Sequence, residues 1–255
     1  MTGGTLLMLG TDKSTTWMVY NELVAQFGPF PILIENNISK FTLIKIRVRK
    51  IGLFKVASQM AFVALIRPLL KRRSAQRVKY LSRLHGLEAT RPTSDLIHHV
   101  ESVNAEDCRA LIKQFAPEVI VVNGTRIIGK KTLACVPATF INTHQGITPR
   151  YRGAHGAYWA LVENRRKECG VTVHLVDEGI DTGNIIAQAA IDPEPEDNFM
   201  TYPILQTAAA MQHIVAAVKS AWKKQVQAVP AAGDGLIWYH PGFFQYIAGA
   251  LRGVW

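Results

Sequence analysis

The chain has 255 residues, a formal net charge of +10 and a sequence pI of about 9.7. Because 48% of the residues are hydrophobic and only 19% are charged, the chain can bury a large core, which excludes global disorder. Its three cysteines, Cys108, Cys135 and Cys169, lack metal-ligand spacing, so neither a disulfide scaffold nor a cysteine-rich zinc site is expected.

Short apolar runs alternate with amphipathic stretches along the chain. The runs at 5–10, 31–35, 119–124, 139–144 and 171–177 predict buried strands, and a further strand should follow Gly183. Apolar spacing predicts helices over 16–27, 103–115 and 204–222, with another apolar helix after Gly153. This alternation indicates an α/β fold with a Rossmann-like, mostly parallel sheet and helices on both faces.

The basic charge is concentrated in one segment. Residues 36–87 contain thirteen Lys and Arg and no acidic residue, whereas the rest of the chain holds sixteen basic and nineteen acidic residues. We interpret about 40–87 as a basic helical insertion, divided at Pro68 into an apolar part and a polar helix that ends near His85 and Gly86. The insertion could be a solvated helical pair that covers the sheet, or it could dock on an acidic membrane surface or a phosphate-bearing ligand.

Nothing in the sequence reads as a signal peptide or a membrane span. The N-terminal apolar run lacks a preceding basic region, and the longest weakly charged apolar run, residues 56–66, has about half of the roughly 20 residues that a span needs. We expect a soluble, cytoplasmic protein that is at most peripheral to a membrane, and we leave a homodimer open.

Two glycine-rich segments do not complete a nucleotide-binding motif. The segment from Gly124 to Lys130 is similar to a phosphate-binding P-loop, but Lys131 stands where Ser or Thr should hold magnesium. No G-x-G-x-x-G follows the first predicted strand. We therefore expect neither triphosphate hydrolysis nor dinucleotide binding, and no metal.

The most informative segment is the strand end that carries Asn142 and His144. Residues two apart on a strand face the same side, and ligands of open α/β sheets bind at the carboxyl ends of the strands. A loop containing Pro149 and Gly153 follows. A second candidate is the turn after the strand at 171–177, where Asp181 should fold back toward the sheet while Asp177 and Glu178 are solvated. We interpret His174 as packed, and we assign no role to His98, His99, His213 or His240.

These two segments resemble the signature of the folate-dependent formyltransferases, the family of glycinamide ribonucleotide, methionyl-tRNA and sugar-nucleotide N-formyltransferases. That signature is Asn-x-His, then Pro and an aromatic-x-Gly loop, then V-D-x-G-x-D-x-G about forty residues later. Here it corresponds to Asn142, His144, Pro149, the segment from Tyr151 to Gly153, and the segment from Val176 to Gly183. The chain departs from the family in having Gln-Gly-Ile-Thr between His144 and Pro149, and in its basic insertion.

The resemblance implies transfer of a formyl group from 10-formyltetrahydrofolate to an amine. Asn142 would donate to the developing oxyanion, His144 would share that task, and Asp181 would orient and charge the histidine and help to move the amine proton through water. The residues expected to bind the folate are Thr125, Arg126, Ile127, Ile128, Gly129, Val176, Asp177 and Gly179. The residues expected to bind the acceptor are Gly10, Thr11, Asp12, Lys13, Tyr151, Arg152 and Gly153.

The amine acceptor is left open among several classes. We favour an amino-sugar nucleotide. The alternatives are glycinamide ribonucleotide, whose enzymes carry a Ser-Asn phosphate loop that differs from residues 10–15 here, and hydrolysis of the formyl group. The methionyl-tRNA enzymes carry a substantial extra C-terminal tRNA-binding domain. We disfavour this acceptor because only about 28 residues follow the helix that ends near Gln227. A non-enzymatic nucleic-acid-binding protein would use the basic segment but would leave Asn142, His144 and Asp181 without a purpose.

We divide the chain into a catalytic domain, 1–227, and a C-terminal tail, 228–255. The tail is rich in aromatic residues, which a solvated segment would not expose. We expect it to pack on the apolar side of the basic insertion, with a second copy of the chain as the alternative.

Overall fold

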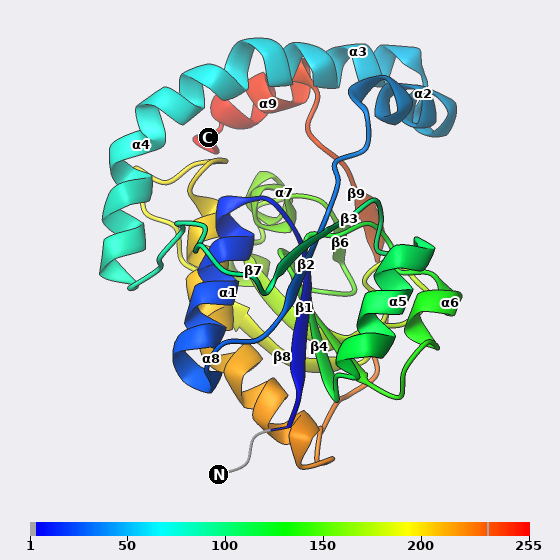
Figure 1. Ribbon diagram of the computed structural model, residues 1–255. Coiled ribbons are helices and arrows are strands. Elements are labelled where there is room, and N and C mark those ends of the chain that lie inside the picture. Colours follow the sequence, from blue (N-terminus) through cyan, green and yellow to red (C-terminus); the bar gives the residue numbers. More distant parts are fainter. Residues whose placement is uncertain (1–3, 234) are drawn as a thin grey trace.

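The computed structural model describes residues 4–233 and 235–255, and its centre is a seven-stranded sheet (Figure 1). The strand order is β3-β2-β1-β4-β5-β7-β8, in which the first five strands are parallel and β7 and β8 are antiparallel to their neighbours. The bounds are β1 Leu6–Thr11, β2 Ile32–Glu35, β3 Ile97–Val100, β4 Val119–Asn123, β5 Thr139–His144, β7 Gly170–Leu175 and β8 Ile185–Ala190. The expected Rossmann-like, mostly parallel sheet is confirmed.

Helices cover both faces of this sheet, as expected from strands that are apolar on both sides (Figure 1). Helices α1 (Ser14–Phe27) and α8 (Tyr202–Trp222) pack on one face through Trp17, Leu23 and Ile214. On the other face, α5 (Glu106–Phe115) packs through Cys108 and Ile112, next to the short helix α6 (Lys130–Leu133). Every long central strand is therefore buried on both sides, and the polar chemistry of the sheet lies at strand ends.

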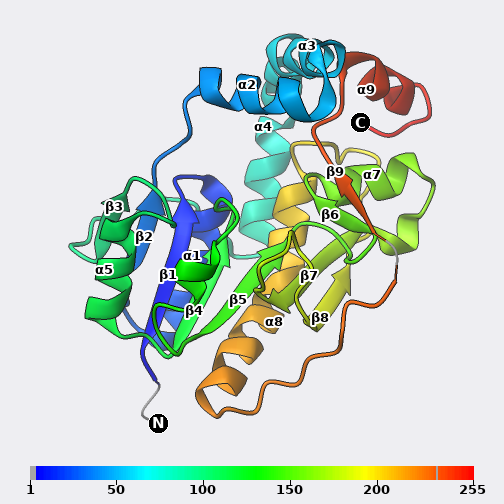
Figure 2. The same cartoon turned by 90° about the vertical axis from the view of Figure 1, so that its right-hand side faces the viewer.

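The basic segment forms helices between β2 and β3 that lie at one end of the molecule (Figures 1 and 2). They are α2 (Lys40–Ile51), α3 (Leu53–Ala61), a π-helical turn (Phe62–Ile66) and α4 (Arg67–Leu84). The expected division at Pro68 is wrong. In the π-helical turn just before Pro68 the Arg67 N–H bonds the Phe62 carbonyl, and the helix continues past Pro68 although that residue has no N–H to donate.

This continuity changes the length of the apolar segment. A single helix runs from Leu53 to Leu84, and among the described residues it is the one segment long and apolar enough to cross a membrane by length and composition alone. Its inner side packs on the rest of the protein. The Phe62 ring contacts Phe199 and Tyr246 at 5.1 and 4.9 Å between ring centroids, and the guanidinium of Arg77 pairs with Asp197.

The C-terminal tail joins the insertion to the catalytic part. Strand β9 (Leu236–Trp238) pairs in parallel with β6 (Tyr151–Gly153), and the Trp238 ring stacks on Trp159 of α7 (Gly156–Val162). Helix α9 (Phe243–Ala250) then packs on α3, and the Gln59 side chain of α3 donates to the carbonyl of His240. The expectation that the tail packs on the insertion is confirmed.

Candidate active site

Four side chains meet at the carboxyl end of β5. Asn142 and His144 come from β5 itself, and His174 comes from the antiparallel neighbour β7, where it stands directly opposite Asn142. Asp181 comes from the turn that follows β7 and has a positive φ of 52°. That left-handed conformation is tolerated by Asp, and it turns the carboxylate back toward the sheet edge as the sequence predicted.

His144 is buried, and both of its ring nitrogens face acceptors. Nδ1 lies 3.2 Å from Asp181 Oδ2, and Nε2 lies 2.6 Å from the carbonyl oxygen of Tyr151. Burial by itself lowers the pKa of His144, but the negative charge of Asp181 and the hydrogen bonds to Asp181 and Tyr151 raise it above its ordinary value. Because only the imidazolium can donate from both nitrogens, this geometry favours the charged ring.

Asp181 is the counter-ion of this histidine. Burial raises its pKa, but the charge of His144, the hydrogen bond with His144 and the Gly153 N–H together hold that pKa well below its usual range. The Gly153 N–H donates to Asp181 Oδ2 at 2.9 Å. The carboxylate is therefore ionised and fixed by two different segments of the chain.

Asn142 completes the cluster through its amide. Its Nδ2 lies 3.0 Å from Nε2 of His174 and 3.5 Å from Oδ1 of Asp181. The Nδ1–H of His174 donates to the Leu175 carbonyl, so Nε2 is the acceptor in the neutral ring and Asn142 is the donor. Sequence reasoning assigned His174 to packing. It is buried, as expected, but it also positions Asn142.

The loop expected to hold the folate is fixed from behind by two residues that the sequence analysis did not select. Glu35, at the end of β2, is buried and accepts from the backbone N–H of Arg126 at 2.6 Å and of Val103 at 3.2 Å. Asn104 donates to the Ile127 carbonyl and accepts from the Gly129 N–H. The sequence could have indicated Glu35, because it is a carboxylate at the end of a predicted buried strand.

The side chains of this loop differ in exposure. Ile128 is buried in the core, whereas Ile127 is exposed. Thr125 and Arg126 make local bonds, the first to the Arg126 carbonyl and the second to the backbone carbonyls of Asn36 and Glu101. Ile127 is therefore the side chain of residues 125–128 that is most exposed to a ligand.

The second folate segment is a tight turn beside that loop. Asp177 accepts from the Gly179 N–H and the Thr182 hydroxyl, so its side chain shapes the turn. Val176 is half-buried against the core below. An ion pair of 3.7 Å between Lys130 and Glu178 links the turn to the loop. The structure thus brings together the two segments that the sequence analysis assigned to the pterin.

The residues expected to bind the acceptor differ in whether their side chains or only their backbone groups are available. The Tyr151 ring is fully buried with its hydroxyl bonded to Glu163, and Arg152 donates to the Gly235 carbonyl. Tyr151 therefore presents its backbone carbonyl, to His144, and not its ring. Gly153 also acts through its backbone, toward Asp181.

The loop that follows β1 is exposed to solvent at Asp12 and Lys13. Thr11 bonds the Gly124 carbonyl, Asp12 accepts from the Trp17 indole, and Gly10 lies against Thr16. Lys13 immediately precedes α1, and burial and the charge of Arg67 lower its pKa, which Glu35 partly offsets.

A histidine pair that was not predicted lies beside this loop. Nε2 of His155 is 3.0 Å from Nδ1 of His240, and Gln59 of the insertion holds the His240 backbone. Burial and the charges of Arg47, Arg67 and Lys13 lower the pKa of His240 to about 4. Burial, His240 and the same three charges hold the pKa of His155 well below its ordinary value. Both rings are thus neutral at pH 7 in strongly cationic surroundings.

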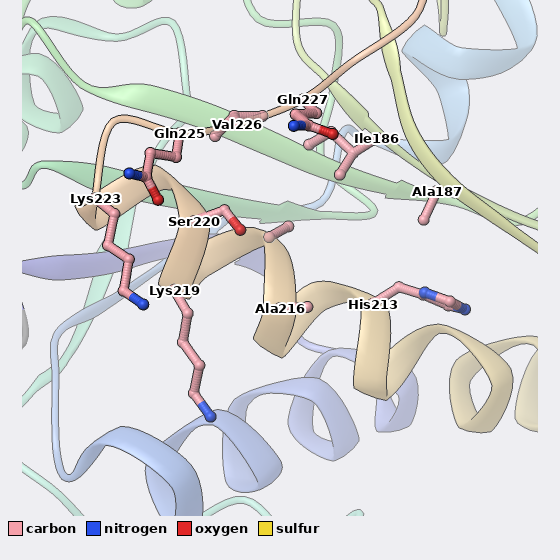
Figure 3. A pocket seen from close by; sticks show the side chains of 11 residues that line it. Ile186, Ala187, His213, Ala216, Lys219, Ser220, Lys223, Gln225, Val226 and Gln227 are labelled. Atoms are coloured by element: carbon pink, nitrogen blue, oxygen red, sulfur yellow. The ribbon is translucent and has the colours of Figure 1, made fainter.

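Two further features concern ligands elsewhere in the molecule. No group of three or more His, Cys, Asp or Glu that could hold a metal occurs within residues 4–233 and 235–255. A hollow of about 760 Å³ is lined by His213 and Lys219 of α8, by Lys223 just after it, and by β8 and residues 225–227. Figure 3 shows these side chains. None of the side chains described in the paragraphs above lines the hollow, so it is separate from the candidate site.

Comparisons with known proteins identify the family of the chain. The sequence profile of the formyl transferase family matches residues 72–218. A methionyl-tRNA formyltransferase of Anaeromyxobacter dehalogenans is 36% identical over 124 residues, which is 48% of this chain but only 37% of that protein. The match thus spans little more than a third of that relative's length.

Solved structures share the fold at low sequence identity. A likely sugar N-formyltransferase from Mycobacterium tuberculosis has a TM-score of 0.60 at 15% identity, covering 98% of this chain and 87% of its own. A glycinamide ribonucleotide transformylase from Symbiobacterium toebii has a TM-score of 0.56 at 15% identity, covering 90% and 95%. A formyltransferase from Anoxybacillus kamchatkensis, solved with a UDP-linked formamido sugar and tetrahydrofolate, has 0.50 at 16%, covering 92% and 85%. The chain belongs to the formyl transferase family.

Proposed function

We propose that the protein transfers a formyl group from 10-formyltetrahydrofolate to the primary amine of an amino-sugar nucleotide. The observation that carries the transfer reaction is the cluster of Asn142, His144 and Asp181 at the carboxyl end of β5. Formyl transfer to an amine requires positive charge and a hydrogen-bond donor where the carbonyl oxygen becomes negative, and a route for the amine proton. The cluster contains groups of both kinds.

In this proposal Asn142 is the donor to the developing negative charge. Its contact to Asp181 is long, at 3.5 Å, so this amide hydrogen can turn to a better acceptor while His174 keeps the other. His144 acts through its positive charge and not as a hydrogen-bond donor to the substrate, because both of its ring nitrogens are already bonded to Asp181 and Tyr151. Asp181 keeps His144 charged and in place. An ionised carboxylate can also hold the water through which the amine loses its proton.

The folate would lie against the loop that Glu35 and Asn104 support and the turn that Asp177 shapes. That site fits a flat heterocycle, because the loop offers an exposed apolar side chain, Ile127, and its backbone edge while its polar contacts on the buried side are already satisfied. When bound, the folate supplies the formyl group. The protein residues position it next to Asn142.

A phosphate-bearing acceptor is supported by the charges around the histidine pair. Lys13 precedes the N-terminus of α1, and Arg47 and Arg67 of the insertion act on the same two rings. Helix N-termini and basic side chains are favourable for phosphate. Two proteins of this fold are named for sugars or were solved with a nucleotide-linked sugar. Glycinamide ribonucleotide, the runner-up, also carries a phosphate.

The test is release of tetrahydrofolate from 10-formyltetrahydrofolate in the presence of single candidate amines. We expect rapid release with a UDP- or dTDP-linked amino sugar and little with glycinamide ribonucleotide or methionyl-tRNA. The Asp181→Asn variant serves as the inactive control. Equally fast release without an amine would replace the transferase with a hydrolase, and release only with glycinamide ribonucleotide or methionyl-tRNA would replace the acceptor.

A further inference from the structure

The outer side of the insertion and of α9 is unusually apolar for a surface. Within the described residues, most of the exposed large apolar side chains lie on these two segments, which adjoin at one end of the molecule in both views (Figures 1 and 2). We call this surface the apolar–basic face, defined by Phe41, Ile46, Leu53, Phe54, Met60, Val63, Leu65, Leu69, Phe244, Ile247 and Leu251. Contiguous apolar surface of this kind normally marks an interaction site.

The same face is strongly cationic. Residues 36–87 carry thirteen Lys and Arg without an acidic residue, and residues 235–255 contain no acidic residue either. The carboxylates that the structure brings to the insertion, Asp197 and Glu194, lie on the inner side of α4 and pair with Arg77. Lys55, Lys71 and Arg72 are exposed beside the apolar side chains, and long basic side chains can reach outward past buried apolar neighbours.

We propose that the apolar–basic face docks the protein on an anionic lipid bilayer, with the helix Leu53–Leu84 lying in the plane of the interface. A helix with one apolar exposed face and flanking Lys and Arg is the physical signature of interfacial binding. Crossing the bilayer is incompatible with this fold, because Phe62, Gln59 and Arg77 are engaged by the rest of the protein along the inner side of the same helix. Figure 1 shows that helix curving over the body of the molecule.

The positive charge of the apolar–basic face favours a bilayer over the other partners that an apolar surface could bind. A second copy of the chain would bring two basic segments together with no acidic partner on either. Nucleic acid would satisfy the positive charge but would leave Phe54, Leu65 and Leu69 against a polar, charged backbone. An anionic bilayer satisfies both, since its headgroups pair with Lys and Arg and its acyl boundary accepts the apolar side chains.

Docking in this orientation has a consequence for the candidate site. Gln59 connects the inner side of the docked helix to His240, and His240 contacts His155. The acceptor end of the site therefore lies directly beneath the docked surface. The inference itself does not depend on the proposed reaction, because binding to vesicles needs neither folate nor amine.

The experiment is co-sedimentation of the full chain with vesicles of phosphatidylcholine alone or mixed with phosphatidylglycerol, at low and at high salt. We expect binding to the mixed vesicles only, weakened by salt. Phe54 is 91% exposed and Leu65 is 59% exposed, so Phe54→Ser and Leu65→Ser should leave the fold intact and lower vesicle affinity at least about tenfold when combined. Val229→Ser is the matched control, because Val229 is 62% exposed outside this face and should have no effect.

A second pair of variants tests the charge. The triple variant Lys71→Gln, Arg72→Gln, Arg73→Gln should lose binding to the mixed vesicles, whereas Lys113→Gln, Lys167→Gln, Lys223→Gln, with the same net charge, should keep it. Absence of vesicle binding by the wild-type protein would overturn the proposal. So would vesicle binding that both triple variants lose equally. Salt-sensitive binding to RNA without vesicle binding would reassign the face to nucleic acid, and a dimer abolished by Phe54→Ser would reassign it to a second copy.

Discussion

The Nδ1 atom of His144 lies 3.2 Å from Oδ2 of Asp181, and the two residues determine each other's charge. The carboxylate raises the pKa of the histidine, and the histidine lowers the pKa of the carboxylate, although burial opposes ionisation of both. The second histidine nitrogen is held by the Tyr151 carbonyl, so neither ring nitrogen is free. His144 can therefore act on a reaction mainly through its charge.

The first prediction concerns the pH dependence of stability. Asp181 has a lowered folded pKa, so its contribution is present above its unfolded pKa of about 4 and is lost as pH falls through the folded value. His144 has a raised folded pKa, so its contribution is fully present below about pH 6.5 and is lost as pH rises through the folded value. The pair contributes fully between about pH 4 and 6.5.

Asp181→Asn should therefore destabilise the protein most within that interval, by about 3–5 kcal/mol, since it leaves a buried histidine without its counter-ion. The difference in the free energy of unfolding between the two proteins should shrink above the raised pKa of His144. Urea denaturation of both proteins across a pH series measures it. A difference that stays constant from acidic to alkaline pH would contradict the ion pair.

The second prediction concerns catalysis. Asn142→Ala and His144→Ala should each lower turnover about 100- to 1000-fold, as loss of a charge-stabilising group does at comparable sites. Asp177→Ala, in the neighbouring turn, should be mild, because Asp177 is exposed and bonds only within its own turn. Steady-state rates with the identified amine measure all three. Turnover that depends on Asp177 as strongly as on Asn142 would show that the reacting carbonyl lies at the turn instead.

The sequence predicted the fold more completely than the site. Buried central strands such as β1 and β4 are almost entirely apolar runs, whereas the edge strand β3 contains His98 and His99 and has no such pattern. Asn142, His144 and Asp181 could be found because a local motif carries them. The pairing of His155 with His240 joins positions 85 residues apart in sequence, and the pairing of β9 in the tail with β6 brings them together.

Pro68 shows a different reason for failure. Proline inside a helical pattern normally ends the helix, and the sequence was divided there. A π-helical turn just before it absorbs the missing hydrogen bond, and such a turn has no signal in the local sequence. The length of the helix from Leu53 to Leu84 therefore had to come from the structure.

The third prediction concerns Glu35, which supports from within the protein the loop 125–129 that we propose binds the folate. Glu35→Gln weakens the bonds to the Arg126 and Val103 N–H groups and removes the ion pair with the Arg126 side chain. We expect a loss of about 1–3 kcal/mol in the free energy of unfolding and a raised KM for the folate with a smaller change in kcat. Glu101→Gln, exposed on the next loop, is the control. An unchanged KM would mean that the loop does not bind the folate.

The fourth prediction concerns the acceptor. Arg47→Gln and Arg67→Gln should each raise the KM for a phosphate-bearing amine about tenfold, which corresponds to about 1.4 kcal/mol, and leave the KM for the folate unchanged. Burial lowers the pKa of His240 to about 4 together with the charges of Arg47, Arg67 and Lys13, so each substitution should also raise that pKa, which a histidine NMR titration measures. Arg49→Gln, exposed on the same helix α2, is the matched control. Loss of acceptor binding in Arg49→Gln alone would place the phosphates elsewhere.

The last prediction concerns the contact between the tail and the insertion. Tyr246 of α9 is fully buried, and its ring centroid lies 4.9 Å from that of Phe62 in the π-helical turn. Tyr246→Ala should cost about 3–5 kcal/mol, as truncation of a buried aromatic side chain does, and should make residues 53–65 sensitive to protease. Phe244→Ala is the control, since Phe244 is its neighbour on the same helix but is exposed.

Limited proteolysis and thermal melting of the two variants, together with a chain truncated before Gly235, separate the possible outcomes. If α9 holds the insertion in place, Tyr246→Ala and the truncation should produce the same new cleavage sites within residues 53–65, and Phe244→Ala should produce none. Since Gln59 joins α3 to the His240 backbone, Tyr246→Ala should also shift the pKa of His240 upward as its surroundings open. A truncated chain that melts at the wild-type temperature and resists cleavage there would show that the insertion folds without the tail.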